Sequence, residues 1–455
     1  MADNTDTPEG VAYGPESASV DKLTLITASG QEIDLKKMII EFSYFEDIYS
    51  FVVSGSVSIR DGQGLIERWQ ITGGEFLDVD FGRVKGSDTN TSRKFRVYKL
   101  GDRKAIENLN SEVFTLHFCS EELLLSEQNK VTKSYSNKGS GEEIHKTVTA
   151  ILREELKVKK DLYIENTRGI YSFVIPRIKP LEAISWLSTY ARPESQALAG
   201  ADMLFYENKD GFNFKSIRSL LNQTPYRTYN YQQNNTDSTL EQKASSVLQY
   251  EFIKSYDALN EISSGTFANR LISVDPATRS YKITDFDYNK YKTTSKPANG
   301  SGLLNGYVNR LGKTDNQSPQ SVVKVVIGNS EQYKVGYIKD KPGSVANDVF
   351  VENYIPNRTA QIALANYTLV KVVVPGDPNL KAGMTVTFNI YSLAIDGDKK
   401  RLDTRFSGKY LVNAVRHIIQ SQGVYQTVME LAKESYETEL SAINKTADLQ
   451  AAINE

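Results

Sequence analysis

The residues best suited to chemistry in this chain are three histidines and one cysteine, and they are far apart in sequence. His117, His145 and His417 stand in strand-like, helix-like and strand-like segments, without the short spacings by which zinc sites gather ligands. His117 and Cys119 would share one face of a strand, but a nucleophile also needs a group that orients its base. We therefore expect no metal site, and we expect Cys119 to be a buried, inert thiol.

His417 stands in an apolar segment, with Val415 and Ile419 two residues to either side. A strand position among apolar side chains favours a buried histidine with a hydrogen-bond partner over a catalytic one. The sequence therefore predicts a structural role for this ring.

Two further patterns match ligand-binding motifs only in part. The Gly-Ser-Gly segment 139–141 precedes a helical segment, but it lacks the lysine and the spacing of a phosphate loop, so we expect a helix cap. Asp285 with Asp287, and Asp396 with Asp398, lack the further oxygen ligands at fixed offsets that calcium needs. We expect these four aspartates to be solvated turn residues.

The composition favours a protein that acts through its surfaces. The formal net charge is −2 and the lysines and arginines are dispersed. The sequence therefore lacks the clustered positive charge by which nucleic-acid-binding proteins hold phosphates. The chain has 26 tyrosines, a residue type favoured at protein interfaces. Among 455 residues we find no convincing catalytic constellation, so we expect a non-enzymatic assembly protein without a cofactor.

Neither a targeting segment nor a membrane span is expected. The first residues, MADNTDTPEGVAYGPES, are polar and acidic, and no later stretch approaches the roughly 20 apolar residues of a membrane helix. We therefore expect the protein to be made and kept in the cytoplasm until something else exports it, and we expect no contact with a membrane.

The elements that would position these residues begin with antiparallel strands. Residues 51–59 and 77–81 alternate between apolar and polar side chains, which predicts strands with one buried face. Segments 94–100 and 112–119 complete a set that we expect to form a small β-barrel or sandwich.

An α/β block is expected next. Ser140 and Glu143 form a capping-box pattern before a helical segment that reaches residue 156, and Pro180 fits the first position of a second helix. Strands 203–206 and 212–215 flank the turn Asn-Lys-Asp-Gly, which predicts a hairpin.

Strand patterns return in the second half of the chain. They cover 249–256, 266–274, 280–286, 369–374, 385–390, 409–419 and 425–431, with a helix at 357–367 and a long polar loop at 292–320. From Lys433 the tail shows only a narrow apolar stripe of Leu440, Ile443 and Ala447, too weak to hold a helix alone. We expect it either to fray or to dock on a partner.

Two runs in the second half carry a recurring pattern. Run 369–383, LVKVVVPGDPNLKAG, is a strand, a Pro-Gly-Asp turn, a leucine and an Ala-Gly turn, and run 407–417, SGKYLVNAVRH, is the strand that follows. Both turns use glycine, and we expect positive φ there. The pattern residues are Pro375, Gly376, Asp377, Gly383, Gly408, Tyr410 and His417.

This pattern resembles the C-terminal barrel of phage baseplate hub proteins, of late-control tail proteins and of the N-terminal part of type VI secretion spike proteins. The strands at 38–42 and 54–61, with an acidic loop between them, resemble the start of the first barrel of these hubs. The resemblance implies an α+β, mainly β fold: two tube-protein-like antiparallel β-barrels with an inserted α/β domain and a helical C-terminal tail.

With this resemblance the expected units are as follows. They are a flexible arm (1–18), the first barrel (19–125), the inserted α/β domain and connector (126–245), the second barrel (246–291 and 365–432), a loop and helix insertion (292–364) and the helical tail (433–455).

The resemblance also implies a function. It implies a structural hub subunit of a contractile phage tail, forming a homotrimeric ring that adapts a hexameric tail tube to a trimeric spike and leaves a channel for DNA. Implied partners are the tail tube or a tube-initiator protein, a separate spike protein and baseplate wedge proteins. DNA would pass without being specifically bound, and the protein would reside in the virion.

Two alternatives stay open at this point. A tail-associated cell-wall hydrolase would need a carboxylate pair or a metal site. A carbohydrate-binding adhesin at the tail tip is favoured by the tyrosines and by the loop at 292–320.

Overall fold

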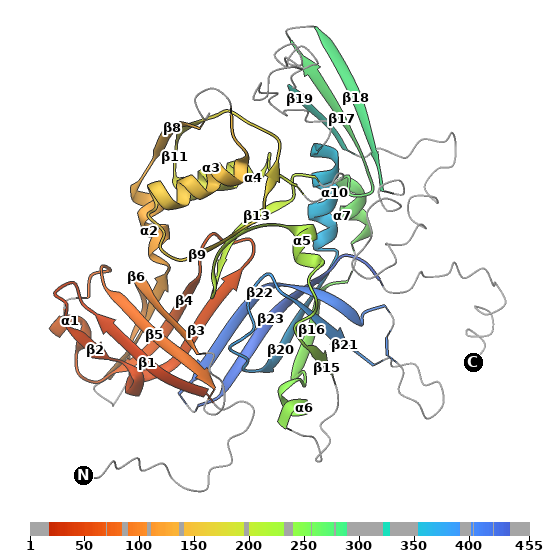
Figure 1. Cartoon of the computed structure of the whole chain (residues 1–455). Coiled ribbons are helices and arrows are strands. Elements are labelled where there is room, and N and C mark those ends of the chain that lie inside the picture. Colours follow the sequence, from red (N-terminus) through yellow and green to blue (C-terminus); the bar gives the residue numbers. More distant parts are fainter. Residues whose placement is uncertain are drawn as a thin grey trace, which may run out of the picture.

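The computed structural model describes most of the chain (Figure 1). The described residues are 18–69, 71–83, 90–106, 111–135, 141–194, 200–231, 240–255, 257–276, 279–288, 322–327, 354–391, 402–403, 405–421 and 423–436. Several expectations fall on residues outside these ranges: the N-terminal arm, Ser140, Asp396, Asp398, the loop at 292–320 and the tail from residue 437.

The N-terminal part is the antiparallel set that the alternation predicted. In β4 (Ser54–Asp61) every second residue is buried, because successive side chains of a strand point to opposite faces. The other elements are β1 (Ala18–Ile26), β2 (Glu32–Asp34), η1 (Lys36–Met38), β3 (Ile39–Asp47), α1 (Leu65–Trp69), β5 (Phe76–Arg83), β6 (Thr91–Ile106) and β7 (Ser111–Cys119).

The inserted α/β unit follows, and two of its predicted features are confirmed. Helix α4 (Pro180–Ser188) opens with its proline in the first turn, where the missing N–H costs no hydrogen bond. Strands β13 (Met203–Asn208) and β14 (Gly211–Ser216) form the hairpin. The other elements are α2 (Glu121–Gln128), β8 (Val131–Tyr135), α3 (Ile144–Ala150), a π-helical turn (Ile151–Glu155), β9 (Asp161–Ile164), β10 (Thr167–Arg168), β11 (Phe173–Ile178), β12 (Arg192–Pro193) and α5 (Ile217–Leu221).

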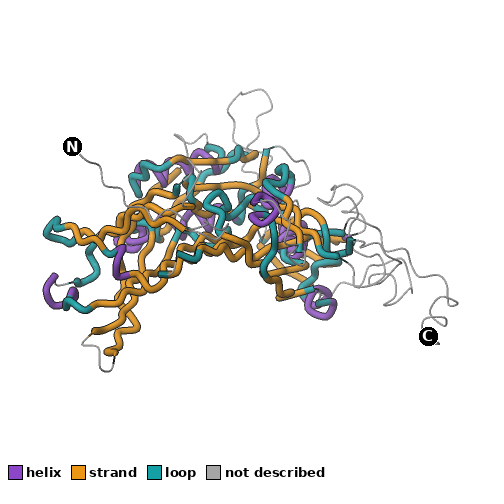
Figure 2. The backbone as a smooth tube through the Cα atoms, turned by 90° about the horizontal axis from the view of Figure 1, so that it is seen from below, coloured by secondary structure: helices purple, strands orange, loops and turns teal. Residues whose placement is uncertain are grey.

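The second β half lies beside the first. Its elements are β15 (Thr228–Asn230), α6 (Leu240–Ala244), β16 (Gln249–Lys254), β20 (Thr368–Pro375), β21 (Thr385–Asn389), β22 (Gly408–Gln420) and β23 (Tyr425–Lys433). Figure 2 shows strands running through both halves of the body, with few and short helices. The mainly β character expected from the sequence is thus confirmed.

The two halves share one 13-stranded sheet. Its order is β16-β20-β23-β22-β3-β4-β7-β6-β5-β1-β2, with β21 paired to β22 and β15 to β21. The halves meet where β22 pairs antiparallel with β3, from Ala414 opposite Asp47 to Gln420 opposite Glu41. Among the described strands this sheet is open, ending at β16 and β2, so the two predicted barrels are not confirmed as closed units.

A separate three-stranded sheet stands apart from the large one. Strand β17 (Ala268–Asp275) pairs antiparallel with β18 (Ser280–Asp287) and parallel with β19 (Val322–Ile327). In Figure 1 this small sheet projects beyond α7 (Ala258–Ser263) and α10 (Ile355–Ala365) at its base. The expected second barrel included β17 and β18, whereas their pairing places them in this projection.

The described fold also continues past the predicted start of the tail. Strand β23 ends at Lys433, whose Nζ donates to the backbone oxygen of Arg405 at 3.1 Å. Tyr436 is buried against other aromatic rings. Residues 433–436 therefore belong to the folded body, and the boundary expected at Lys433 is too early.

The Ala-Gly turn adopts the expected backbone. Gly383 has a φ of +83°, which confirms the positive φ predicted there. A Cβ at this position would lie 2.1 Å from the Tyr206 hydroxyl oxygen, so the turn also needs the missing side chain for space. Gly376 has no positive φ; its hydrogen is required because a Cβ would lie 2.0 Å from the Tyr425 ring.

Gly383→Ala should therefore cost more stability than backbone strain alone. Gly30 is a matched control, because it has the same φ of +83° and open space around it. We expect Gly30→Ala to lose about 1 kcal/mol and Gly383→Ala about 1 to 3 kcal/mol more. Urea denaturation of both variants measures the difference, and equal losses would show that Tyr206 moves aside freely.

Candidate functional site

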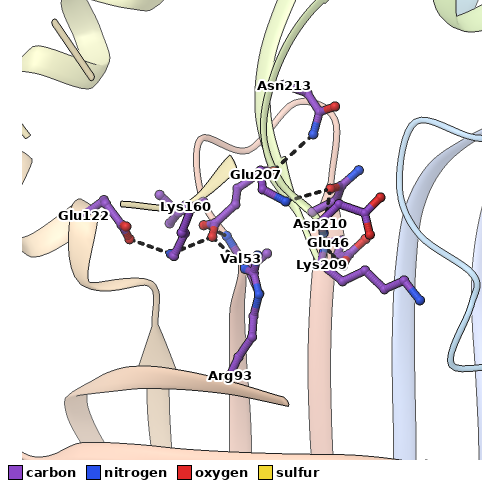
Figure 3. Close-up of polar contacts among 12 residues, drawn as sticks. Glu46, Val53, Arg93, Glu122, Lys160, Glu207, Lys209, Asp210 and Asn213 are labelled. Carbon is purple, nitrogen blue, oxygen red and sulfur yellow. Dashed lines mark hydrogen bonds and ion pairs between the residues drawn. The ribbon is translucent and has the colours of Figure 1, made fainter. Parts of the chain in front are cut away.

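The first β half, the α/β unit and the second β half meet at a buried polar junction. Figure 3 shows Glu207 of the α/β hairpin between Lys160 and Arg93, with Glu46 beside the hairpin turn. We call this set of contacts around Glu46 and Glu207 the polar junction.

Glu207 forms the more strongly charged part of the junction. Its side chain in β13 is fully buried, and Oε1 accepts hydrogen bonds from Arg93 Nη1 of β6 and from Lys160 Nζ, each at 2.7 Å. Its Oε2 accepts the backbone N–H of Val53 at 3.1 Å. Lys160 also contacts Glu122 of α2 at 2.7 Å. One carboxylate thus joins the α/β unit to β6 and to the residue that precedes β4 in the first β half.

The cations decide the charge state of Glu207. Burial alone would raise the pKa of this carboxyl, but Lys160 and Arg93 outweigh that effect and hold the pKa below its ordinary value. Glu207 is therefore ionised at neutral pH, and its charge is compensated only while both cations stay in place.

Glu46, at the end of β3, connects all three units. Its Oε1 accepts hydrogen bonds from the Tyr44 hydroxyl at 2.8 Å and from the backbone N–H of Lys209 at 2.6 Å. Its Oε2 accepts the backbone N–H of Ala382, in the second β half, at 2.8 Å. Burial raises the pKa of Glu46 to about 7, against these three donors and nearby Arg93.

The hairpin turn adds two contacts to the second β half. Lys209 Nζ donates to the backbone oxygen of Pro378 at 2.8 Å, and Asp210 forms an ion pair with Lys381. The chemistry of the junction is therefore that of a clamp, in which charged groups from distant segments neutralise one another.

Asp377, one of the pattern residues, organises a second buried contact. Its backbone N–H donates to Thr427 Oγ1 at 3.0 Å. Its Oδ2 accepts hydrogen bonds from Arg227 Nη1 at 2.8 Å and from the Tyr226 hydroxyl at 3.3 Å. The turn after β20 is thereby fixed to β23 and to the connector before β15.

His417 is buried and hydrogen-bonded, as predicted. Its Nε2 donates to the Leu380 backbone oxygen at 3.2 Å, which leaves Nδ1 to accept from the Tyr425 hydroxyl at 2.8 Å. Burial lowers the pKa of His417 to about 4, so the ring is neutral at physiological pH.

The other pattern residues lie in the same β half. Pro375 is the last residue of β20 and pairs with Gln426. Gly408 opens β22, and the Tyr410 hydroxyl donates to the Phe406 backbone oxygen at 2.6 Å. The structure thus places the seven pattern residues on and beside β20 and β22, and none of the seven forms one of the described hydrogen bonds to Glu46 or Glu207.

The remaining chemistry-bearing residues are dispersed. Cys119 is buried as expected, and burial raises the pKa of its thiol to about 11. His145 Nδ1 accepts the backbone N–H of Thr167 at 3.1 Å. Asp285 and Asp287 lie in β18, which corrects their assignment to a turn.

Within the described ranges, no three His, Cys, Asp or Glu side chains are grouped so that they could hold a metal ion. No helix in this part of the chain is long and apolar enough to cross a membrane.

Sequence reasoning missed the polar junction. Its two carboxylates follow aromatic residues within strands, Glu46 after Phe45 and Glu207 after Tyr206. An acidic residue in an otherwise buried strand is a signal for a buried charge with a partner, but it does not say which partner.

Removing the charge of Glu207 should destabilise the chain strongly. Glu207→Gln leaves Arg93 and Lys160 without their shared carboxylate, and breaking such a buried pair costs about 3 to 5 kcal/mol. Glu154→Gln is the control, because Glu154 pairs with Lys133 on the surface and should lose less than about 1 kcal/mol. Equal losses in chemical denaturation would contradict a central role for the junction.

Glu46 should make stability depend on pH. Its folded-state pKa of about 7 exceeds the ordinary 4.5, so the folded chain binds the extra proton between these values. The contribution of Glu46 to the free energy of unfolding is therefore complete below pH 4.5, and it is lost as the pH rises from there through 7.

Relative to Glu46→Gln, the parent should lose up to about 3 kcal/mol of unfolding free energy between pH 5 and pH 8. Burial also raises the pKa of Asp202 to about 7, but Asp202 is present in both proteins, so its effect cancels in the difference. Denaturation of both proteins at the two pH values tests this, and a constant difference would show that Glu46 keeps one charge state.

No protein-family model matches this chain. The chain is 24% identical over 404 residues to the probable baseplate hub protein gp334 of Vibrio phage KVP40, and the alignment covers 84% of this chain and 87% of that protein.

Two solved structures share the fold. One is a tail protein from Neisseria meningitidis MC58, with a TM-score of 0.50, 10% identity and coverage of 91% of this chain and 96% of that one. The other is the 43 kDa tail protein of prophage MuSo2 from Shewanella oneidensis, with a TM-score of 0.52, 8% identity and coverage of 91% and 98%. The resemblance to phage baseplate hub proteins is thereby confirmed: over most of its length this chain is similar to a probable baseplate hub protein, and it has the fold of these two tail proteins.

Proposed function

We propose that this chain is a structural subunit of the central baseplate hub of a contractile phage tail. The observation that carries the proposal is the similarity to a probable hub protein along 84% of this chain and 87% of that protein. A match of this extent involves both β halves and the α/β unit, rather than one shared domain.

In the proposed assembly three chains form a ring. Each chain supplies two β halves, so a trimer presents six such units to a hexameric tail tube and three-fold symmetry to a spike. Support comes from the large sheet, because the pairing of β22 with β3 fixes the two halves relative to each other. The polar junction then fixes the α/β unit against both.

The proposed partners are the tail tube or a tube-initiator protein, a separate spike protein and baseplate wedge proteins. DNA would pass through the ring without being specifically bound, in keeping with the net charge of −2. The chain would reside in the virion and would act without catalysis. The two buried carboxylates of the junction support this, since both are committed to structural contacts.

The isolated chain should form trimers. Native mass spectrometry of the full chain at micromolar concentration should show a species of three chains, and addition of the tail tube protein of the same phage should give a larger complex. A monomer that fails to assemble even with tube and spike proteins would overturn the proposal. Release of sugars or peptides from purified cell wall would instead favour a hydrolase.

A further inference from the structure

The small sheet formed by β17, β18 and β19 has one exposed apolar face. Register places Ile272 beside Ile283 and Val325, so all three point the same way. Tyr281 and Val325 on this face are 71% and 66% exposed, and Ile283 and Val323 are exposed as well. We call this set the outer face of the small sheet.

The charged side chains of the outer face lie at one end of it. Arg270 and Asp285 are directly opposite in the register, with Nε to Oδ1 at 2.7 Å and Nη2 to Oδ2 at 2.9 Å. Asp287 follows on the same face, two residues after Asp285 at the end of β18. The rest presents β-branched and aromatic side chains, a composition typical of a surface that is covered by another element.

The opposite face of the sheet is already covered. Leu271 is buried with Ala201 and Tyr354, and Lys324 Nζ donates to Thr359 Oγ1 of α10 at 2.6 Å. The sheet therefore has one layer of helix on its inner side, and within the described residues its outer side carries no such layer.

The described chain ends beside this sheet. Tyr436 is buried in a cluster with Phe267, Phe286 and Tyr288, which lie at the ends of β17 and β18. Its ring also makes an edge contact with Tyr367, with centroids 6.3 Å apart. The segment that follows therefore starts next to β18, which is an edge strand of the small sheet.

The sequence of residues 437–455 fits an apolar cover. Leu440, Ile443 and Ala447 would share one face of a helix. A helix over residues 440–455 would span about 24 Å. Strand β18, with 8 residues, spans about 27 Å, so such a helix is close to the length of the sheet.

We propose that residues 437–455 of the same chain cover the outer face of the small sheet. The polar residues 437–439 pass the edge of β18, and the stripe of Leu440, Ile443 and Ala447 then packs on the exposed side chains. The free tail would not hold a helix in water, because its apolar stripe is too narrow. The exposed sheet face leaves apolar side chains in contact with water, and covering them is favourable. This contact lies within one chain, and it does not depend on the proposed hub function.

A charge on the outer face should release the tail. Trypsin cleaves after Lys445, and a docked tail is cut only when it opens. We expect Val325→Asp to speed release of the peptide 446–455 by about tenfold or more in the full chain, followed by mass spectrometry. Val174→Asp is the matched control, because Val174 on β11 is 67% exposed but lies on another sheet, and its rate should equal that of the parent. Equal rates for both variants would overturn the proposal.

Disulfide formation between two introduced cysteines tests which segment covers the outer face. Val325→Cys with Ile443→Cys should form a disulfide within one chain on oxidation, detected by non-reducing electrophoresis and peptide mapping. Val325→Cys with Ala442→Cys, on the far side of the helix, should form little. The native Cys119 is buried and does not compete. Disulfide-linked dimers from the first pair would show that a second copy of the chain covers the face. Absence of a disulfide from the first pair would show that the tail does not lie on the face. Either result overturns the proposal.

Discussion

The structure depends on keeping the charge of Glu207 compensated where it is buried. An isolated carboxylate in such a position would cost several kcal/mol, and Arg93 and Lys160 remove that cost only from their native positions. Arg93 belongs to β6 of the first β half, whereas Lys160 and Glu207 belong to the α/β unit. The two units must therefore pack in one arrangement, because a shift of either would leave a buried charge without its partner.

Glu46 extends the same constraint to the second β half. It accepts backbone N–H groups from Lys209 of the hairpin turn and from Ala382 of the Ala-Gly turn. The conformation of that turn then matters, since Gly383 directly follows Ala382, has a positive φ and leaves room for Tyr206. A recurring sequence pattern, visible without any structure, thus marks a loop whose backbone completes a long-range contact.

Sequence patterns predicted what is local and missed what is distant. Alternation located β4 and β5, Pro180 marked the start of α4, and the Asn-Lys-Asp-Gly turn marked the hairpin, because each signal is set by neighbouring residues. Alternation shows which face of a strand is buried but not which strand lies beside it, so the shared sheet and the separation of β17 and β18 were not foreseen. The polar junction was missed for the same reason, since Glu46 and Ala382 are distant in sequence.

The shared sheet has a consequence for the proposed ring. Two β halves joined by a flexible linker could adopt many angles, and a ring with six regularly spaced units would then have to order each linker as it assembled. Here β22 and β3 are joined by a ladder of backbone hydrogen bonds, and the aromatic core of the first half includes Ile419 and Tyr425 of the second. The angle between the halves is therefore set within each chain before assembly. Three such chains need only find one another, which lowers the ordering cost that ring formation must overcome.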